Sequence, residues 1–117
     1  MSPVVRACLV HCTDPRIQEG IEWLRLAYGL RFGEFDRVAV AGGGGYSDRF
    51  ERELEIAVRH HGVRELFLSG HEDCLAGTTV EMLLETAERC RRRYDGQMIV
   101  RAFWLYLDGA RKELSLP

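Results

Sequence analysis

Two short segments carry the side chains best suited to chemistry in this sequence, at residues 11–16 and 70–74. Each segment directly follows an apolar run that predicts a buried strand, residues 4–10 before the first segment and residues 66–69 before the second. In an open α/β sheet, binding sites form beyond the carboxyl ends of the strands. We therefore expect the two segments to meet at one edge of a small sheet.

The two segments together supply a set of metal ligands. Cysteine sulfur and histidine nitrogen are the ligands that zinc prefers, and three protein ligands leave one tetrahedral position open. Cys12, His71 and Cys74 form such a set. A zinc ion in an open site lowers the pKa of its water to about 7, which gives a nucleophile at neutral pH. The sequence thus predicts Zn²⁺ held by these three residues.

A carboxylate and a guanidinium accompany the first cysteine. Cys12, Asp14 and Arg16 occupy alternate positions, and alternate side chains leave an extended segment on the same side. Asp14 would then accept a hydrogen bond from a zinc-bound water or ligate the metal, while Arg16 holds it ionised through paired hydrogen bonds. The pair also fits a salt bridge that caps the following helix.

The remaining chain predicts alternating strands and helices. Strands are expected near residues 4–10, 38–41, 63–69 and 98–107, and residues 113–116 are expected to return as a short antiparallel strand. Helices are expected over about 17–28, with Trp23 on its apolar face, from Ser47 or Asp48 to His61, and from Thr78 or Thr79 onward. This alternation predicts an α/β fold in three layers, with a mostly parallel sheet between helices. We expect residues 1–117 to form a single domain.

The two segments and their surroundings resemble the β-class carbonic anhydrases. The likeness lies in Cys12-x-Asp14-x-Arg16 and in Gly70-His71-x-x-Cys74, and extends over residues 53–74 and 105–109. It implies a four-stranded core in the order 2-1-3-4, with a possible fifth strand. It also implies zinc-dependent reversible hydration of CO2 to bicarbonate by a zinc-bound hydroxide. Cys12, His71 and Cys74 would be the metal ligands, and Asp14 with Arg16 the catalytic orienting pair.

Two other functions stay open on the same site. The first is hydrolysis of a CO2 analogue such as carbonyl sulfide or carbon disulfide. The second is a non-catalytic zinc protein, in which Asp14 closes the metal site. The altered loop at 42–45, four glycines in a row, motivates the second alternative. We interpret this loop either as a flexible lid over the zinc pocket or as a plain connection.

Composition restricts partners and compartment. Hydrophobic residues make up 46% of the chain and charged residues 29%, with a net charge of -2, so neither a nucleic acid nor a membrane is expected as a partner. We expect a small-molecule substrate and a homodimer or higher homo-oligomer. With no secretory signal recognised, a reducing cytoplasm is expected, where cysteines serve metals before disulfides.

The other candidate residues have simpler interpretations. Cys8 and Cys90 are expected to be small core side chains. His11 should point to the opposite face from the adjacent ligand and be structural. Glu72 and Asp73 are expected to be solvent-facing turn residues.

Overall fold

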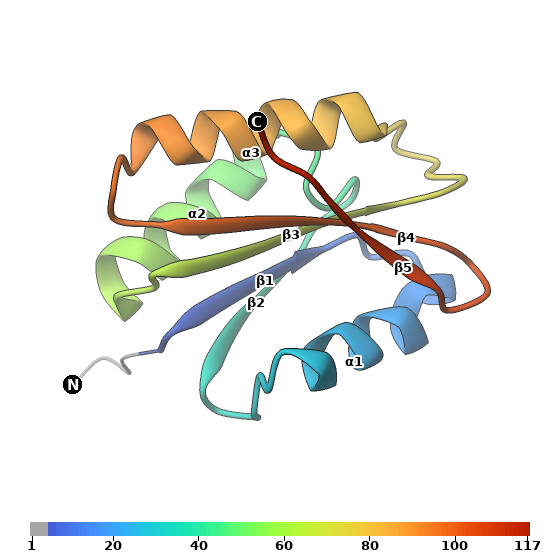
Figure 1. The fold of residues 1–117 in the computed structure, drawn as a ribbon, viewed down its shortest axis with the longest axis horizontal. Helices are drawn as coiled ribbons and strands as arrows, with labels where there is room; N and C mark the ends of the chain where they lie inside the picture. The colour runs from blue at the N-terminus through green and yellow to red at the C-terminus, as the bar shows by residue number, and fades with distance from the viewer. Residues whose placement is uncertain (1–4) are drawn as a thin grey trace.

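The computed structural model describes residues 5–117, so Val4, at which the first strand was expected to begin, lies outside the described residues. One five-stranded sheet forms the centre of the structure (Figure 1). Its strands are β1 (Ala7–His11), β2 (Phe35–Ala39), β3 (Glu65–His71), β4 (Ile99–Leu105) and β5 (Arg111–Leu114). Their order is β2-β1-β3-β4-β5. The first four strands are parallel and β5 is antiparallel to β4, which confirms the expected order and the terminal strand.

Helices cover both faces of this sheet. A single 3-10 turn, Pro15–Ile17, leads into α1 (Gln18–Ala27) on one face. The other face carries α2 (Asp48–His61) and α3 (Val80–Arg93) (Figure 1). The expected three-layer architecture is therefore confirmed. Among the described residues, no helix has both the length and the apolar character needed to span a bilayer.

The sheet separates two apolar clusters because successive strand residues point to opposite faces. Toward α2 and α3 the cluster includes Cys8, Val10, Phe50, Leu54, Leu66, Leu68, Leu83, Ala87 and Cys90. Toward α1 it includes Ala7, Leu9, Ile21, Leu24, Phe67, Phe103 and Leu105. The rings of Phe67 and Phe103 stack with centroids 6.2 Å apart in the second cluster. Both faces of the sheet are thus buried against helices.

Side-chain capping determines where α2 and α3 begin. Ser47 Oγ accepts a hydrogen bond from the Phe50 amide at 3.1 Å, and Thr79 Oγ1 accepts one from the Met82 amide at 3.2 Å. These bonds satisfy amides that the first helical turn leaves without partners. Gly62 ends α2 in the left-handed conformation, with φ of 72°. The predicted starts of both helices, and the end of α2, are confirmed.

Some predicted features are wrong in detail. β2 begins at Phe35 rather than 38, because parallel pairing with β1 sets its register from Phe35 opposite Ala7 to Ala39 opposite His11. Polar residues are tolerated in β2 since it is an edge strand. Trp23 is 46% exposed instead of lying on the inner face of α1. Its ring packs against Gly109, where an added Cβ would approach it to 2.9 Å.

Candidate metal centre

The candidate ligands lie at one edge of the sheet because β1 and β3 are parallel neighbours. Cys12 directly follows β1, and Cys74 lies in the turn after β3. His71 is the last residue of β3 itself, so the expected strand end at residue 69 is two residues too early. The strand continues because His71 pairs with Leu105 of β4. The two sequence segments therefore meet, as their position after parallel strands predicts.

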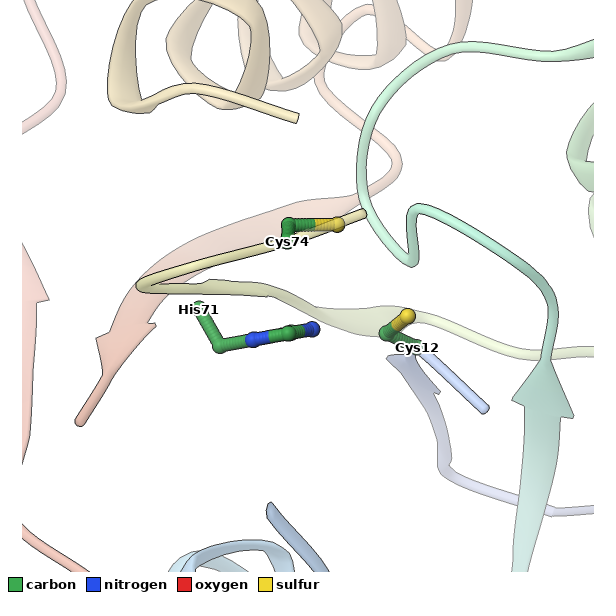
Figure 2. A group of neighbouring side chains, drawn as sticks. All are labelled: Cys12, His71 and Cys74. Carbon is green, nitrogen blue, oxygen red and sulfur yellow. The ribbon is translucent and has the colours of Figure 1, made fainter. Parts of the chain in front are cut away.

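The three side chains face a common space, as Figure 2 shows. One sulfur or nitrogen atom from each of Cys12, His71 and Cys74 lies within 4.8 Å of the others. Cys12 and His71 are buried, and Cys74 is half-buried. Two thiols and one imidazole at this spacing are a donor set that can hold one zinc ion and leave a position open.

The hydrogen bonding of His71 tests whether a metal fits. Its side chain is 1% exposed, and Nδ1 lies 2.7 Å from the carbonyl oxygen of Glu72. Since a carbonyl only accepts, Nδ1 carries the proton and Nε2 bears a free lone pair. Nε2 is buried and has no hydrogen-bond partner among the described residues. A buried polar atom without a partner is costly, and a metal ion bound by Nε2 would satisfy it. The residues present therefore fit zinc.

The glycine loop at 42–45 forms a wall behind Cys12. All four glycines are buried, and the Gly42 amide donates a hydrogen bond to Cys12 Sγ at 3.4 Å. Two further hydrogen bonds hold the loop. Thr78 Oγ1 donates to the Gly42 carbonyl at 2.7 Å, and the Gly44 amide donates to the Ser69 carbonyl of β3 at 2.8 Å. A loop packed in this way is not a flexible lid, so that interpretation is wrong. Instead, the loop donates a hydrogen bond from its Gly42 amide to the Cys12 sulfur and so supports this candidate ligand.

Asp14 and Arg16 form the expected pair. Arg16 Nη2 lies 2.7 Å from Asp14 Oδ2, and Arg16 Nε lies 3.1 Å from Oδ1. These hydrogen bonds lower the pKa of Asp14 to about 2, so that its carboxylate stays ionised at neutral pH. Asp14 Oδ1 also accepts the Arg16 amide at 2.9 Å, which caps the 3-10 turn. The geometry thus contains both the orienting pair and the helix cap.

The Asp14 carboxylate lies beside the candidate ligands. Its Oδ2 is 3.9 Å from His71 Nε2, the nitrogen that would bind metal. At this separation a rotation of the side chain would decide whether Asp14 contacts Arg16 or the metal position. The structure holds it on Arg16.

Two turn residues make contacts that were not expected. Glu72 is half-buried, and its Oε1 accepts the Leu107 amide at 2.8 Å, which ties the ligand turn to the end of β4. Asp73 is exposed but its Oδ2 lies 2.9 Å from Arg16 Nη1. The expectation of a solvent-facing residue is therefore wrong for Glu72, whereas Asp73 is solvent-facing as expected and in addition binds Arg16.

A cavity of about 440 Å³ adjoins the centre on the α1 side of the sheet. It is lined by His11, Cys12, Thr13, Asp14, Ile17, Gln18, Ile21, Glu22, Arg37 and Ala39. His11 and Cys12 line the same cavity, so the expected opposite orientation of His11 is wrong; strand alternation ends at His11. Burial lowers the pKa of His11, with Arg37 nearby acting in the same direction.

Sequence reasoning did not assign Arg37, Asp73 or the Gly42 amide to the site. Of these three, only Asp73 could have been suspected from the sequence, because Asp is one of the few residues that accept the positive φ of a tight turn. The other two reach the site through β2 pairing and loop packing, which no local pattern records.

A β2-β1-β3-β4-β5 sheet between helices, with a Cys-His-Cys cluster at its carboxyl edge, defines a fold of the β-carbonic anhydrase type. Comparison with protein-family models and with curated proteins gave no match. Solved structures do match the chain over nearly its whole length.

Three of these structures illustrate the likeness. A carbonic anhydrase from Streptococcus mutans has a TM-score of 0.67 and 19% identity, covering 97% of this chain and 84% of its own. The β-carbonic anhydrase CafD of Aspergillus fumigatus has a TM-score of 0.68 and 14% identity, covering 97% and 91%. A carbon disulfide hydrolase has a TM-score of 0.67 and 13% identity, covering 92% and 77%. The resemblance is thus confirmed at the level of the fold.

Proposed function

We propose that this protein is a zinc-dependent carbonic anhydrase that interconverts CO2 and bicarbonate. The observation that carries the proposal is His71 Nε2, a buried nitrogen without a partner among the described residues, facing two cysteine sulfurs at a sheet edge. Cys12, His71 and Cys74 would hold the ion. Zinc in such a site supplies Lewis acidity and makes water a nucleophile at neutral pH.

Asp14 and Arg16 would orient the reacting water. With its pKa at about 2, Asp14 is a hydrogen-bond acceptor across the physiological range and does not act as an acid. Arg16 donates its amide and Nε to Oδ1 of Asp14 and its Nη2 to Oδ2, which leaves a lone pair of Oδ2 to accept a hydrogen bond from water. This fixes which lone pair of the water faces the carbon of CO2.

The adjoining cavity has walls that suit both sides of the reaction. Ile17 and Ile21 give it an apolar surface, which suits CO2. Arg37 also lines it, and a guanidinium suits bicarbonate. The two carboxylates in the lining are already paired, Asp14 with Arg16 and Glu22 with Arg25. The charge of Arg37 therefore remains available for an anion.

Carbon disulfide hydrolysis is a second candidate, because one structural neighbour is a carbon disulfide hydrolase. Both substrates are small linear molecules with an electrophilic carbon, and the same ligand set would serve either. Release of sulfide from carbon disulfide or carbonyl sulfide, at a rate above that of CO2 hydration, would favour this alternative. A metal centre closed by Asp14, inactive toward all three gases, would favour the non-catalytic alternative.

A stopped-flow indicator assay with zinc-loaded protein tests the main proposal. We expect CO2 hydration above the buffer rate. Cys74→Ser should lower zinc affinity by at least about 100-fold, because losing a ligand costs more affinity than losing a residue that only hydrogen-bonds to a ligand. Asp14→Asn should keep the zinc and impair turnover. Confirmed zinc with no rate enhancement would refute the proposal, and equal metal loss in both variants would refute the assigned roles.

We further expect the protein to work in a reducing compartment such as the cytoplasm. Its four cysteines are all free in the structure, and the two candidate thiol ligands bind metal only while reduced.

A further inference from the structure

Arg16 joins the two segments that carry the candidate ligands. On one side its Nη2 contacts Asp14 Oδ2 at 2.7 Å. On the other, Nη1 donates to Asp73 Oδ2 at 2.9 Å and Nη2 donates to the Asp73 carbonyl at 3.0 Å. Asp73 thus binds the guanidinium through both its side chain and its backbone. With Nη1 and Nη2 bound by Asp73, the guanidinium turns its Nε and Nη2 edge toward Asp14.

Asp73 also has an unusual backbone. Its φ is +54°, and within residues 5–117 no other residue except glycine has a positive φ. It lies between His71 and Cys74, so this left-handed residue turns the chain from one candidate ligand to the other. A strained conformation of this kind persists where surrounding contacts impose it. Here the contacts include those of Asp73 with Arg16 and those of the neighbouring Glu72 with residues 105 and 107.

We propose that Asp73 is a positioning residue that keeps the candidate metal site open. By holding Arg16, it keeps the guanidinium where it binds Asp14, and so keeps Asp14 from turning onto the metal. The Asp14 carboxylate lies within reach of both partners, since its Oδ2 is 2.7 Å from Arg16 Nη2 and 3.9 Å from His71 Nε2, the nitrogen that would bind the metal. This inference rests on the proposed function, because it assumes a metal ion at Cys12, His71 and Cys74.

The expected effect is moderate, because the contact is open to solvent. The side chain of Asp73 is 69% exposed and that of Arg16 is 41% exposed. Exposed ion pairs are weak, so losing the Asp73 carboxylate should change the balance between open and closed sites by about two- to fivefold. The ratio of closed sites, in which Asp14 contacts the metal, to open sites would rise by the same factor.

The experiment uses the full chain loaded with Co²⁺, whose visible absorption reports the ligands around it. Azide, a small anion, serves as the probe of an open position. Asp73→Asn and Asp73→Gly both remove the charge while accepting a positive φ. Asp73→Ala removes the charge and also disfavours that φ. Asp95→Asn is the matched control, because Asp95 is exposed in the turn after α3.

We expect Asp73→Asn and Asp73→Gly to weaken azide binding by about two- to fivefold while Co²⁺ affinity stays the same or rises. Their spectra without azide should move toward four protein ligands. Asp73→Ala should in addition weaken Co²⁺ binding, because Cys74 is displaced. Asp95→Asn should match the unmodified protein in both measurements.

Three results would overturn the inference. The first is unchanged azide affinity in Asp73→Asn and Asp73→Gly. The second is a parallel loss of Co²⁺ affinity in those two variants, which would make Asp73 a purely structural part of the turn. The third is an unmodified protein that ignores azide, because Asp14 would then occupy the metal despite Asp73. An azide response without any CO2 hydration would instead refute only the proposed function.

Discussion

The four cysteines occupy chemically different surroundings. Cys8 of β1 and Cys90 of α3 are buried among the apolar side chains between the sheet and helices α2 and α3, and burial raises both thiol pKa values, that of Cys90 to about 11. Cys12 is buried beside the Gly42 amide, whereas Cys74 is half-buried at the sheet edge. Thiolate character and access together determine reactivity, so the two pairs should respond differently to an alkylating reagent.

We predict that iodoacetamide at pH 8 modifies Cys74 in metal-free protein and leaves Cys8 and Cys90 unmodified. Zinc should protect Cys74, because a coordinated sulfur is no longer a free nucleophile. Peptide mass spectrometry after a timed reaction measures each site separately, and urea-unfolded protein provides the control in which all four react. Modification of Cys90 as fast as Cys74 in the folded protein would contradict the prediction.

Residue types and spacing were enough to predict the candidate ligands. Cys12, His71 and Cys74 follow apolar runs, and parallel strands bring their ends together. The orientation of individual side chains was harder to predict. The His11 prediction failed because alternation stops where β1 ends, and Asp73 was missed because its partner Arg16 is remote in sequence.

At the scale of elements, the glycine loop shows how tightly the site is built. Gly43 has a φ of +54°, and a Cβ there would lie 2.7 Å from the Ser69 carbonyl oxygen and 2.8 Å from the Cys12 nitrogen. Both are backbone atoms, one in β3 and the other directly after β1, so they cannot move aside cheaply. The loop needs glycine for space as well as for conformation.

We predict that Gly43→Ala lowers the free energy of unfolding by about 1–3 kcal/mol more than Gly29→Ala does. Gly29 is the matched control: its φ is +65°, but nothing lies within 4 Å of an added Cβ. Both variants carry the cost of a positive φ, and only Gly43→Ala adds a clash. Urea denaturation followed by circular dichroism gives both values. Equal losses would show that the loop can relax.

Helix starts were predictable because Ser47 and Thr79 carry their capping hydroxyls in the local sequence. The start of β2 was not, because its polar residues become strand only through pairing with β1. Trp23 illustrates the same limit. Helical periodicity placed it with Ile21 and Leu24, but the turn at Gly109 offers its ring a separate surface.

At the scale of the whole molecule, several large apolar side chains remain exposed. Leu75, directly after the candidate ligand Cys74, is 94% exposed, and Ile56 on α2 is also exposed. We predict that the protein is a homodimer by sedimentation velocity. Leu75→Asp should weaken the dimer because it places a charge where a second copy would cover an apolar side chain, while Ile56→Asp serves as the control on another face. Monomer alone at every concentration would contradict this prediction.

Metal binding should stabilise the entire fold, because its ligands come from the ends of two strands. A ligand that binds only the folded state adds about 2.7 kcal/mol of stability at 100 times its Kd. For a protein of this size, that predicts a rise in Tm on the order of 10 °C when zinc is added to chelator-treated protein. Calorimetry with and without zinc measures the shift.

Cys74→Ser is the control for this prediction, since it removes a ligand from the half-buried turn and changes one atom at the margin of the apolar cluster toward α1. It should abolish most of the zinc-dependent rise in Tm while changing the Tm of the metal-free protein little. Asp14→Asn should keep the rise, because Asp14 is held by Arg16 in the structure and is not needed to bind the ion. An equal zinc response in Cys74→Ser and the unmodified protein would place the metal elsewhere. Loss of the response in Asp14→Asn would instead mean that Asp14 is a fourth ligand and that the site is closed.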